Sequence, residues 1–245
     1  MEIVAQLIRP TAFLGGVGSA NRMLPVAEVA TEAWRHRAPT AARNKGFGRI
    51  SLRNGDTEIQ AILFDFMGVL LFLRDDYPGE KTVDAVDDMI GGVVDDDAFR
   101  NAAEEKLSLS GEEFQKVLAR IPEKYEPYPP LWDLLPSLRK QYKLGILNNG
   151  TRLTYPYFDA ELGLSERFDL VLSSGAEGVR KPDLESYLRA ARGLGVDPGR
   201  CLFMDDSMLN IQGAEQAGMQ TVLWKNREEG FRDFLERIKA DGWKG

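Results

Sequence analysis

The stretch Ile59-Gln60-Ala61-Ile62-Leu63-Phe64-Asp65-Phe66-Met67-Gly68-Val69-Leu70 decides the fold of this 245-residue chain. It begins with a short apolar run that only Gln60 interrupts, and the run ends at Asp65, with Gly68 close behind. A short apolar run bounded by turn signals is typical of a strand that is buried on both faces of a sheet. The stretch therefore predicts a central strand that carries Asp65 at its carboxyl end.

Similar apolar runs recur along the rest of the chain, at residues 142–147, 168–172, 201–204 and 221–224. Apolar residues at helical spacing separate or follow these runs, in residues 184–194, 211–218 and 231–238. Strands that alternate with helices indicate a parallel sheet with helices on both faces. The expected fold class is therefore α/β, with a Rossmann-like parallel sheet.

The segment between the first two predicted strands, residues 75–130, shows helical patterns and no convincing strand. Its apolar residues form two helical stripes, Val83, Val86, Met89, Ile90 and Val93, and then Phe114, Val117, Leu118 and Ile121. Ser110 and Glu113 form a capping box before the second stripe, and Asp95-Asp96-Asp97 is interpreted as a solvated helix start. We expect a small α-helical cap, inserted into a core of residues 58–74 and 131–245. Such an insertion can cover a ligand site like a lid.

The first part of the chain, residues 1–57, differs from the rest in charge. Residues 1–55 contain eight Lys/Arg and three acidic residues, a formal charge of +5, whereas the remainder carries −12. Three interpretations of this basic extension stay open: a disordered or loosely docked extension, a targeting segment, or a start site assigned too far upstream.

The composition narrows the chemistry that the chain can perform. Its net charge of −7 argues against nucleic acid as the main partner, because a phosphate backbone attracts clusters of Lys and Arg. The chain has one cysteine, Cys201, so it cannot form an intrachain disulfide. Because it also has only one histidine, His36, we expect neither Ser-His-Asp catalysis nor a transition-metal site. The expected metal is therefore Mg²⁺. No stretch has the length of a membrane-spanning helix and no signal peptide is visible, so we expect no membrane partner and a cytoplasmic location. We also expect a monomer or homodimer.

Polar residues follow the predicted strands at the end where open α/β sheets bind their ligands. They are Asp65, the segment Asn148-Asn149-Gly150, Lys181 and the pair Asp205-Asp206. Taken alone, each is compatible with a turn or a helix start. Their joint occurrence, each after an apolar run, predicts a phosphate and metal site.

Each of these residues has an expected task. Asp65 and Asp206 share one Mg²⁺, which lets a carboxylate approach a phosphate that would otherwise repel it. Asp65 then forms an acyl phosphate, so that hydrolysis proceeds in two easier steps. Lys181 stabilises charge on the transferred group, and the Asn148 amide and the backbone N–H groups of Asn149-Gly150 hold phosphoryl oxygens.

From about Ile59 to the C-terminus, the chain resembles the haloacid dehalogenase-like hydrolases that carry a helical cap. The resemblance rests on four motifs in matching order: Phe64-Asp65-Phe66-Met67-Gly68-Val69-Leu70, Ile146-Leu147-Asn148-Asn149-Gly150, Gly178-Val179-Arg180-Lys181-Pro182-Asp183, and Phe203-Met204-Asp205-Asp206-Ser207. It is greatest to sugar-phosphatase-type members and to the phosphatase domains related to epoxide hydrolases. The resemblance implies that Asp65 is the nucleophile, that Asp206 is a metal ligand, and that Asp205 supports the ligands or pairs with Lys181.

Two residues depart from the pattern of the phosphatases in this family. Met67 stands where they usually carry a second Asp as general acid and base, although its backbone carbonyl can still bind Mg²⁺. The loss of a positioned acid typically costs about 10²–10⁴-fold in rate, which favours substrates with good leaving groups, such as anomeric sugar phosphates and acyl phosphates. Asn148 replaces the usual Ser or Thr, and its amide N–H can still donate.

The predicted function is a Mg²⁺-dependent phosphomonoester hydrolase that forms an aspartyl-phosphate at Asp65 and acts on a small phosphorylated metabolite. One alternative is a 2-haloacid dehalogenase, because a halide leaves without a proton, but Asp205-Asp206 favours Mg²⁺ and phosphate. The other is a non-catalytic relative that binds a phosphorylated ligand or a protein, an interpretation that Met67 favours and the intact Asp65 and Lys181 oppose.

Overall fold

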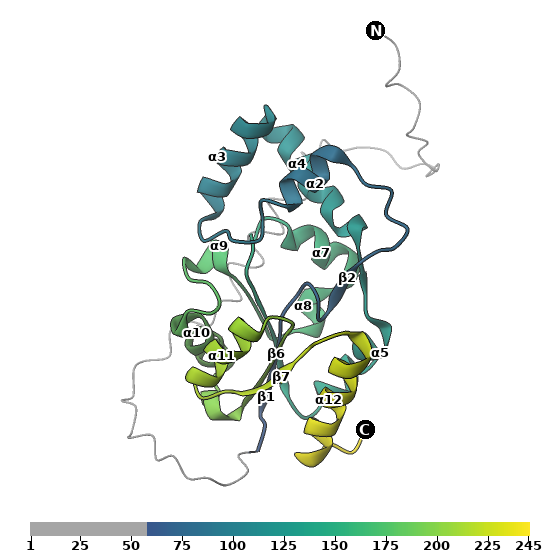
Figure 1. Cartoon of the computed structure of the whole chain (residues 1–245), viewed down its shortest axis with the longest axis vertical. Helices are drawn as coiled ribbons and strands as arrows, with labels where there is room; N and C mark the ends of the chain where they lie inside the picture. The colour runs from purple at the N-terminus through teal and green to yellow at the C-terminus, as the bar shows by residue number, and fades with distance from the viewer. Residues whose placement is uncertain (1–57) are drawn as a thin grey trace, which may run out of the picture. The chain divides into compact units, whose positions relative to one another are not determined.

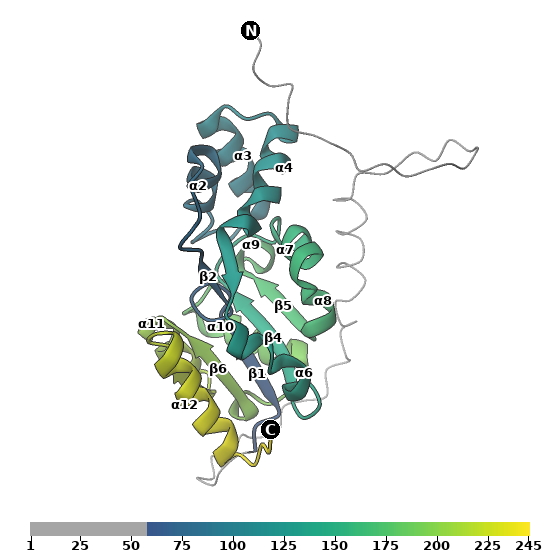
Figure 2. The same cartoon turned by 90° about the vertical axis from the view of Figure 1, so that its right-hand side faces the viewer.

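Five parallel strands form the central sheet, in the order β5-β4-β1-β6-β7 (Figures 1 and 2). They are β1 (Ala61–Phe64), β4 (Lys143–Asn148), β5 (Leu170–Ser173), β6 (Cys201–Asp205) and β7 (Gln220–Leu223). The chain builds outward from β1 to β5 and then returns to the other side of β1 with β6. This reversal makes the carboxyl ends of β1 and β6 the switch point at which a ligand is expected to bind.

The computed structural model describes residues 58–245. The predictions for the basic extension, residues 1–57, lie outside the described residues. Each of the five predicted strands overlaps an observed one, so the α/β class predicted from the sequence is confirmed.

Alternate residues of β1 enter two separate apolar cores, one on each face of the sheet. Ala61 and Leu63 pack in the core beneath α10 and α11, whereas Ile62 and Phe64 pack in the core that includes α7 and α12. Since both faces are covered, the strands are nearly continuous apolar runs. The covering helices are α7 (Tyr155–Leu162), α10 (Leu184–Leu194), α11 (Met208–Gln216) and α12 (Arg227–Ala240).

Short helical turns complete the core. They are α5 (Pro129–Trp132), α6 (Leu135–Leu138), α8 (Leu164–Arg167), α9 (Ser174–Glu177) and the 3₁₀ turn η2 (Pro198–Arg200). Cys201 is fully buried in β6, and Trp224 is buried beside α12.

The helical insertion follows β1, at the carboxyl end of the sheet (Figure 1). Its elements are α2 (Lys81–Asp87), α3 (Asp96–Leu107), α4 (Gly111–Arg120) and the 3₁₀ turn η1 (Ile121–Lys124). The predicted capping box is present, because the Ser110 hydroxyl accepts from the Glu113 N–H and the Glu113 carboxylate accepts from the Ser110 N–H. Two strands that the sequence did not reveal, β2 (Leu71–Leu73) and β3 (Tyr125–Pro127), pair antiparallel where the insertion joins the core. With three residues each, they are too short to show a period.

The first predicted helical stripe of the insertion is wrong in its second half. Helix α2 ends at Asp87, and Met89, Ile90 and Val93 lie in the turn and loop of residues 88–94. The adjacent Gly91 and Gly92 disfavour a helix here. Asp95 then starts α3 as its N-cap and accepts from two backbone N–H groups of the first turn, at 3.0 and 2.8 Å.

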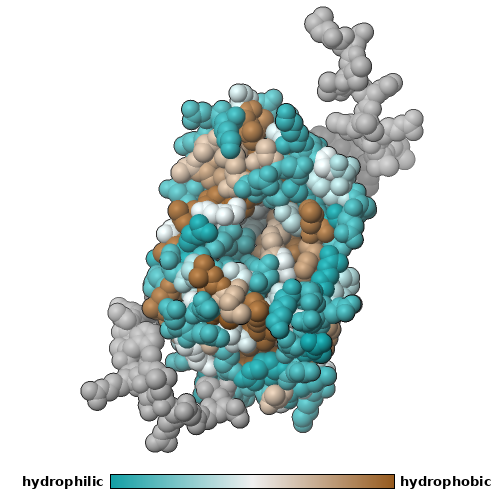
Figure 3. All heavy atoms as spheres, viewed as in Figure 1, coloured by the Kyte–Doolittle hydropathy of each residue, from teal (hydrophilic) through white to brown (hydrophobic). Residues whose placement is uncertain are grey.

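Hydrophilic residues predominate on the face shown in Figure 3, and hydrophobic residues form separate patches on it. The large apolar side chains that are exposed in residues 58–245 are Leu73, Val94, Leu184, Met208 and Leu209. Among the helices of this described part, none combines the length and the apolar character needed to cross a membrane.

Candidate active site

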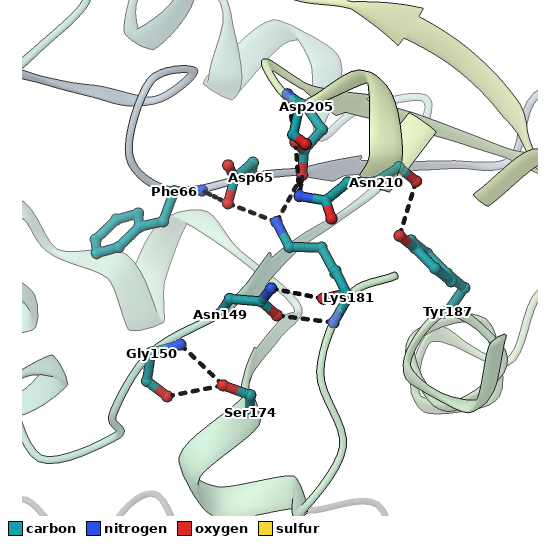
Figure 4. Close-up of polar contacts among 10 residues, drawn as sticks. Asp65, Phe66, Asn149, Gly150, Ser174, Lys181, Tyr187, Asp205 and Asn210 are labelled. Atoms are coloured by element: carbon teal, nitrogen blue, oxygen red, sulfur yellow. Dashed lines mark hydrogen bonds and ion pairs between the residues drawn. The ribbon is translucent and has the colours of Figure 1, made fainter. Parts of the chain in front are cut away.

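The Lys181 ammonium lies between two carboxylates at the carboxyl end of the sheet (Figure 4). Its Nζ is 2.7 Å from Asp65 Oδ1 and 2.6 Å from Asp205 Oδ2. Lys181 is 2% exposed and Asp205 is completely buried. Charges taken out of water in this way persist only when they are paired and hydrogen-bonded, so the three side chains act as one unit.

Asp205 is held by the start of α11. Its Oδ1 accepts from the Ser207 N–H at 2.8 Å and from the Asn210 amide at 2.9 Å, and its Oδ2 accepts from the same amide at 3.1 Å. The Tyr187 hydroxyl in turn donates to the Asn210 carbonyl at 2.7 Å (Figure 4). No motif in the sequence singles out Asn210, whose only signal is an amide in the first turn of the helix that follows the Asp pair.

Lys181 is held through its backbone by Asn149. The Asn149 amide donates to the Lys181 carbonyl and accepts from the Lys181 N–H, both at 2.8 Å (Figure 4). The loop after β4 is thereby joined to the segment that follows α9 and carries Lys181. From the sequence, Asn149 is expected to bind phosphate through its backbone N–H, whereas in the structure its side chain also clamps Lys181.

Asp65 directly follows the central strand β1, and its Oδ1 also accepts from the Phe66 N–H at 2.7 Å. Burial raises the pKa of Asp65 to about 7, and the negative charge of Asp205 acts in the same direction, whereas Lys181 opposes both. Burial works against the charge of Lys181, but the two carboxylates outweigh it, so the pKa of Lys181 is raised. The unit therefore keeps its ammonium while Asp65 competes for a proton near neutral pH.

Asp206 adds a third carboxylate to the site. Asp65, Asp205 and Asp206 each offer an oxygen, and these oxygens lie within 4.8 Å of one another. Burial, followed by the charge of Asp205, raises the pKa of Asp206. Three carboxylates that face one ammonium leave an excess of negative charge on hard oxygen donors, which is the donor set that Mg²⁺ prefers. The residues present therefore fit the metal.

Gly68 lets the turn after Asp65 approach this third carboxylate. Its φ is +86°, and a Cβ built at Gly68 would lie 2.5 Å from Asp206 Oδ2. A side chain at this position would meet both a disfavoured backbone conformation and a steric overlap. The glycine is thus required for the position of Asp206 next to the strand that carries Asp65.

The two neighbours of Met67 in the chain form backbone hydrogen bonds with Leu71. The Leu71 N–H donates to the Phe66 carbonyl at 2.9 Å, and the Gly68 N–H donates to the Leu71 carbonyl at 2.8 Å. Neither bond uses the Met67 carbonyl. Its side chain is half-buried against the apolar core, where it offers no proton.

The predicted phosphate loop follows β4. Asn148 is half-buried at the strand end, and its Nδ2 would lie 2.9 Å from a Cβ at Gly150, so a side chain at Gly150 would displace this amide. The Gly150 N–H donates to Ser174 Oγ at 3.0 Å (Figure 4). This N–H, which the sequence predicts to bind a phosphoryl oxygen, therefore already donates to Ser174, a residue that no sequence motif indicates.

One member of the acidic run in the insertion is not solvated, contrary to the sequence-based interpretation. Asp96 is buried and accepts from the Thr151 hydroxyl and from the Arg152 N–H. Its environment depends on a loop 55 positions away in the chain, which no local pattern could reveal.

The chain is similar in sequence to known phosphatases and to a dehalogenase. The chain is 35% identical over 118 residues to glyceraldehyde 3-phosphate phosphatase of Methanopyrus kandleri, covering 47% of this chain and 50% of that protein. It is 31% identical over 98 residues to N-acylneuraminate-9-phosphatase of Rattus norvegicus, covering 40% of each. It is also 33% identical over 111 residues to (S)-2-haloacid dehalogenase of Xanthobacter autotrophicus, covering 45% of this chain and 44% of the dehalogenase. The matches thus span about half or less of these curated relatives.

Solved structures agree on the fold. A HAD family enzyme of Bacteroides thetaiotaomicron, in complex with magnesium and inorganic phosphate, superposes with a TM-score of 0.52 at 19% identity, covering 67% of this chain and 93% of the other. A predicted HAD-like family hydrolase of Porphyromonas gingivalis superposes with a TM-score of 0.55 at 23% identity, covering 75% and 98%. The model of the haloacid dehalogenase-like hydrolase family matches residues 59–218, a range that includes every residue of the carboxylate and lysine unit. By this match and by its fold, the chain belongs to the haloacid dehalogenase-like hydrolases.

Proposed function

We propose that this protein is a Mg²⁺-dependent phosphatase that uses Asp65 as its nucleophile. The observation that carries the proposal is the position of the Lys181 ammonium between Asp65 and Asp205, with Asp206 as a third carboxylate beside them. A site for phosphoryl transfer needs a nucleophile, a fixed cation and ligands for a metal within reach of one another. The carboxyl ends of β1 and β6 bring these groups together.

The two contacts of Asp65 described above, from Phe66 N–H and Lys181, are both made to Oδ1. Its Oδ2 is therefore the oxygen that we expect to attack phosphorus. The leaving group departs as the aspartyl-phosphate forms, and water then hydrolyses this acyl phosphate and regenerates Asp65. An ammonium has three N–H donors, and Lys181 uses two of them on carboxylates, so the third can contact the transferred phosphoryl group.

Asp65, Asp206 and the Met67 carbonyl would hold Mg²⁺, with Asp205 in support because its two oxygens already accept from Lys181, Ser207 and Asn210. The bound metal would neutralise phosphate charge and lower the repulsion between the phosphate and Asp65.

The phosphoryl oxygens would be held by the Asn148 amide, the backbone N–H of Asn149 and Lys181. The Gly150 N–H would join them only by leaving Ser174, so we assign it no part in the first contact. The helical insertion would act as a cap that sets specificity, because the core motifs recognise the phosphate alone.

The substrate class is a small phosphorylated metabolite whose leaving group departs without a proton, such as a sugar 1-phosphate or an acyl phosphate. Met67 supports this choice, since its side chain cannot protonate a leaving oxygen. The names of the phosphatase relatives, glyceraldehyde 3-phosphate phosphatase and N-acylneuraminate-9-phosphatase, support small phosphorylated metabolites as a class. A cytoplasmic location and a monomeric or homodimeric state stay predictions of the sequence.

Phosphate release from a panel of sugar, nucleotide and acyl phosphates tests the proposal, with Mg²⁺ and with EDTA. We expect release that needs Mg²⁺, is lost in Asp65→Asn and falls sharply in Lys181→Ala. The exposed Lys140 supplies a matched control, Lys140→Ala, which should keep the wild-type rate.

The second candidate is a 2-haloacid dehalogenase, which Met67 and the similarity to the Xanthobacter enzyme favour. Halide release from 2-haloacids in EDTA, with no phosphate release from any substrate, would replace the phosphatase proposal by this one. The absence of both reactions would point to a non-catalytic relative.

A further inference from the structure

Asp96 connects the insertion to the loop that follows the proposed phosphate site. It is the first residue of α3 and is 7% exposed. Its Oδ1 accepts from the Thr151 hydroxyl at 2.6 Å and from the Arg152 N–H at 3.1 Å, and its Oδ2 lies 3.7 Å from the Arg152 Nε. The Asp96 carboxylate is buried and accepts two hydrogen bonds from the core loop that follows β4. It therefore makes a specific contact with the core and is not a solvated residue at a helix start.

The neighbouring acidic residues show that helix capping does not explain the burial of Asp96. Asp95 already supplies the N-cap of α3, and the Asp97 side chain is 87% exposed. Among the three, Asp96 alone contacts the core.

A second bridge lies beside the first. Ser174 Oγ donates to the Val93 carbonyl of the insertion and accepts from the Gly150 N–H. The Gly175 N–H then donates to the Gly150 carbonyl at 2.9 Å. Residues 150–152 are thus held from both sides when the insertion is docked.

The core surface around Asp96 leaves no room for a side chain at Gly175. A Cβ at Gly175 would overlap Asp96 Oδ1 and would lie 3.0 Å from Val93 Cγ1. A Cβ at Gly150 would lie 3.1 Å from Ile90 Cγ2. Glycines at both contact points therefore let the turn at residues 88–94 and the start of α3 approach the core.

The same loop positions the proposed catalytic lysine. Residue 149, immediately before the clamped segment, holds the Lys181 backbone through its amide at 2.8 Å. A covalently continuous path therefore runs from the Asp96 contact through Thr151 and Gly150 to Asn149, and from there to Lys181.

We propose that Asp96 is a positioning residue that orders residues 150–152 when the helical insertion docks on the core. Asp96 thereby couples the closure of the insertion over the substrate to the placement of Asn149 and Lys181. This inference rests on the proposed phosphatase function for its effect on catalysis, whereas its structural effect does not.

Hydrogen exchange of the full-length protein, followed at residues 150–153, tests the structural effect. In Asp96→Ala we expect exchange there to accelerate about tenfold or more, because the loss of buried hydrogen bonds favours local opening. Asp96→Asn keeps an acceptor for Thr151 and Arg152 and should restore most of the protection. Asp97→Ala, the matched control on the same helix, should exchange like the wild type.

Steady-state kinetics on the best phosphate substrate test the effect on catalysis. We expect kcat of Asp96→Ala to fall about 10–100-fold with a smaller change in KM, since substrate binds before the insertion closes. Asp96→Asn should recover kcat, and Asp97→Ala should leave it unchanged.

Unchanged exchange at residues 150–153 in Asp96→Ala would overturn the inference. A loss of protection or of kcat that Asp97→Ala reproduces would overturn it as well. If the wild type shows no phosphatase activity, the proposed function fails, while the exchange data still decide on the contact. Should Asp96→Ala fail to fold, Thr151→Val removes the hydroxyl that donates to Asp96 and that also accepts from the Leu153 N–H. Exchange at Arg152, whose N–H donates to Asp96 and not to Thr151, should then accelerate.

Discussion

Asn149 and Lys181 are paired through both groups of one side-chain amide, which binds the N–H and the carbonyl of the same lysine at 2.8 Å each. The amide therefore fixes the point from which the Lys181 side chain extends toward Asp65 and Asp205. A short rigid clamp of this kind positions a charge more precisely than the long lysine side chain could by itself.

Replacing Asn149 by Asp should remove one of the two hydrogen bonds of this clamp and keep the other. The carboxylate can still accept from the Lys181 N–H but cannot donate to its carbonyl, which is then left without this donor. We expect kcat/KM for phosphate release to fall about 10–100-fold and the free energy of unfolding to fall by about 1–3 kcal/mol. Asn101→Asp, on the exposed surface of α3, serves as the control. Wild-type kinetics in Asn149→Asp would show that the clamp does not position Lys181.

Installing an acid at position 67 should broaden the substrate range. Because a positioned acid is worth about 10²–10⁴-fold, Met67→Asp should accelerate hydrolysis of alkyl phosphates far more than that of acyl phosphates. The ratio of kcat/KM for an alkyl and an acyl phosphate measures the effect. An equal change for both substrates would mean that the leaving group already receives its proton from another residue.

A side chain at Gly68 should weaken the metal site. Gly68→Ala places a methyl group 2.5 Å from the present position of Asp206 Oδ2, in a backbone with φ of +86°, so Asp206 must move away. Calorimetric titration with Mg²⁺ should show at least a tenfold weaker affinity. Gly91→Ala is the matched control, because a Cβ there meets no atom within 4 Å and the backbone has no positive φ. Equal affinities in the two variants would remove Asp206 from the ligand set.

Mg²⁺ affinity should depend on pH in the neutral range. Since burial raises the pKa of Asp65 to about 7, a proton competes with the metal below this pH, and binding should tighten as the pH rises through about 7. Each unit below it should weaken the apparent affinity by up to about tenfold, and metal binding should release protons. Titrations at pH 5.5 to 8.5 in two buffers of different ionisation enthalpy measure both effects. Affinity that is independent of pH would show that Asp65 is ionised throughout this range.

The strands and the main site residues could be predicted because their signals are local. The run from Ile59 to Phe64 is buried on both faces, and a polar residue at the end of such a run reaches the carboxyl edge of the sheet in any α/β arrangement. Asp65 and Asp205 were found on this basis, and Lys181 was found through the motif at residues 178–183; the structure brings the three side chains within hydrogen-bonding distance. The second half of the first insertion stripe was wrong because apolar spacing continues across Gly91-Gly92 although the helix does not.

By itself, the sequence determined the α/β class, the helical insertion and the side chains that meet at the switch point, since periodicity and strand-end position need no knowledge of distant residues. Only the tertiary structure decided that Asn149 clamps Lys181, that Ser174 occupies the Gly150 N–H and that Asp96 is buried while Asp97 is exposed. Each of these outcomes depends on partners between 24 and 55 positions away. A polar side chain carries no local sign of its partner, because its burial becomes favourable only when that partner arrives.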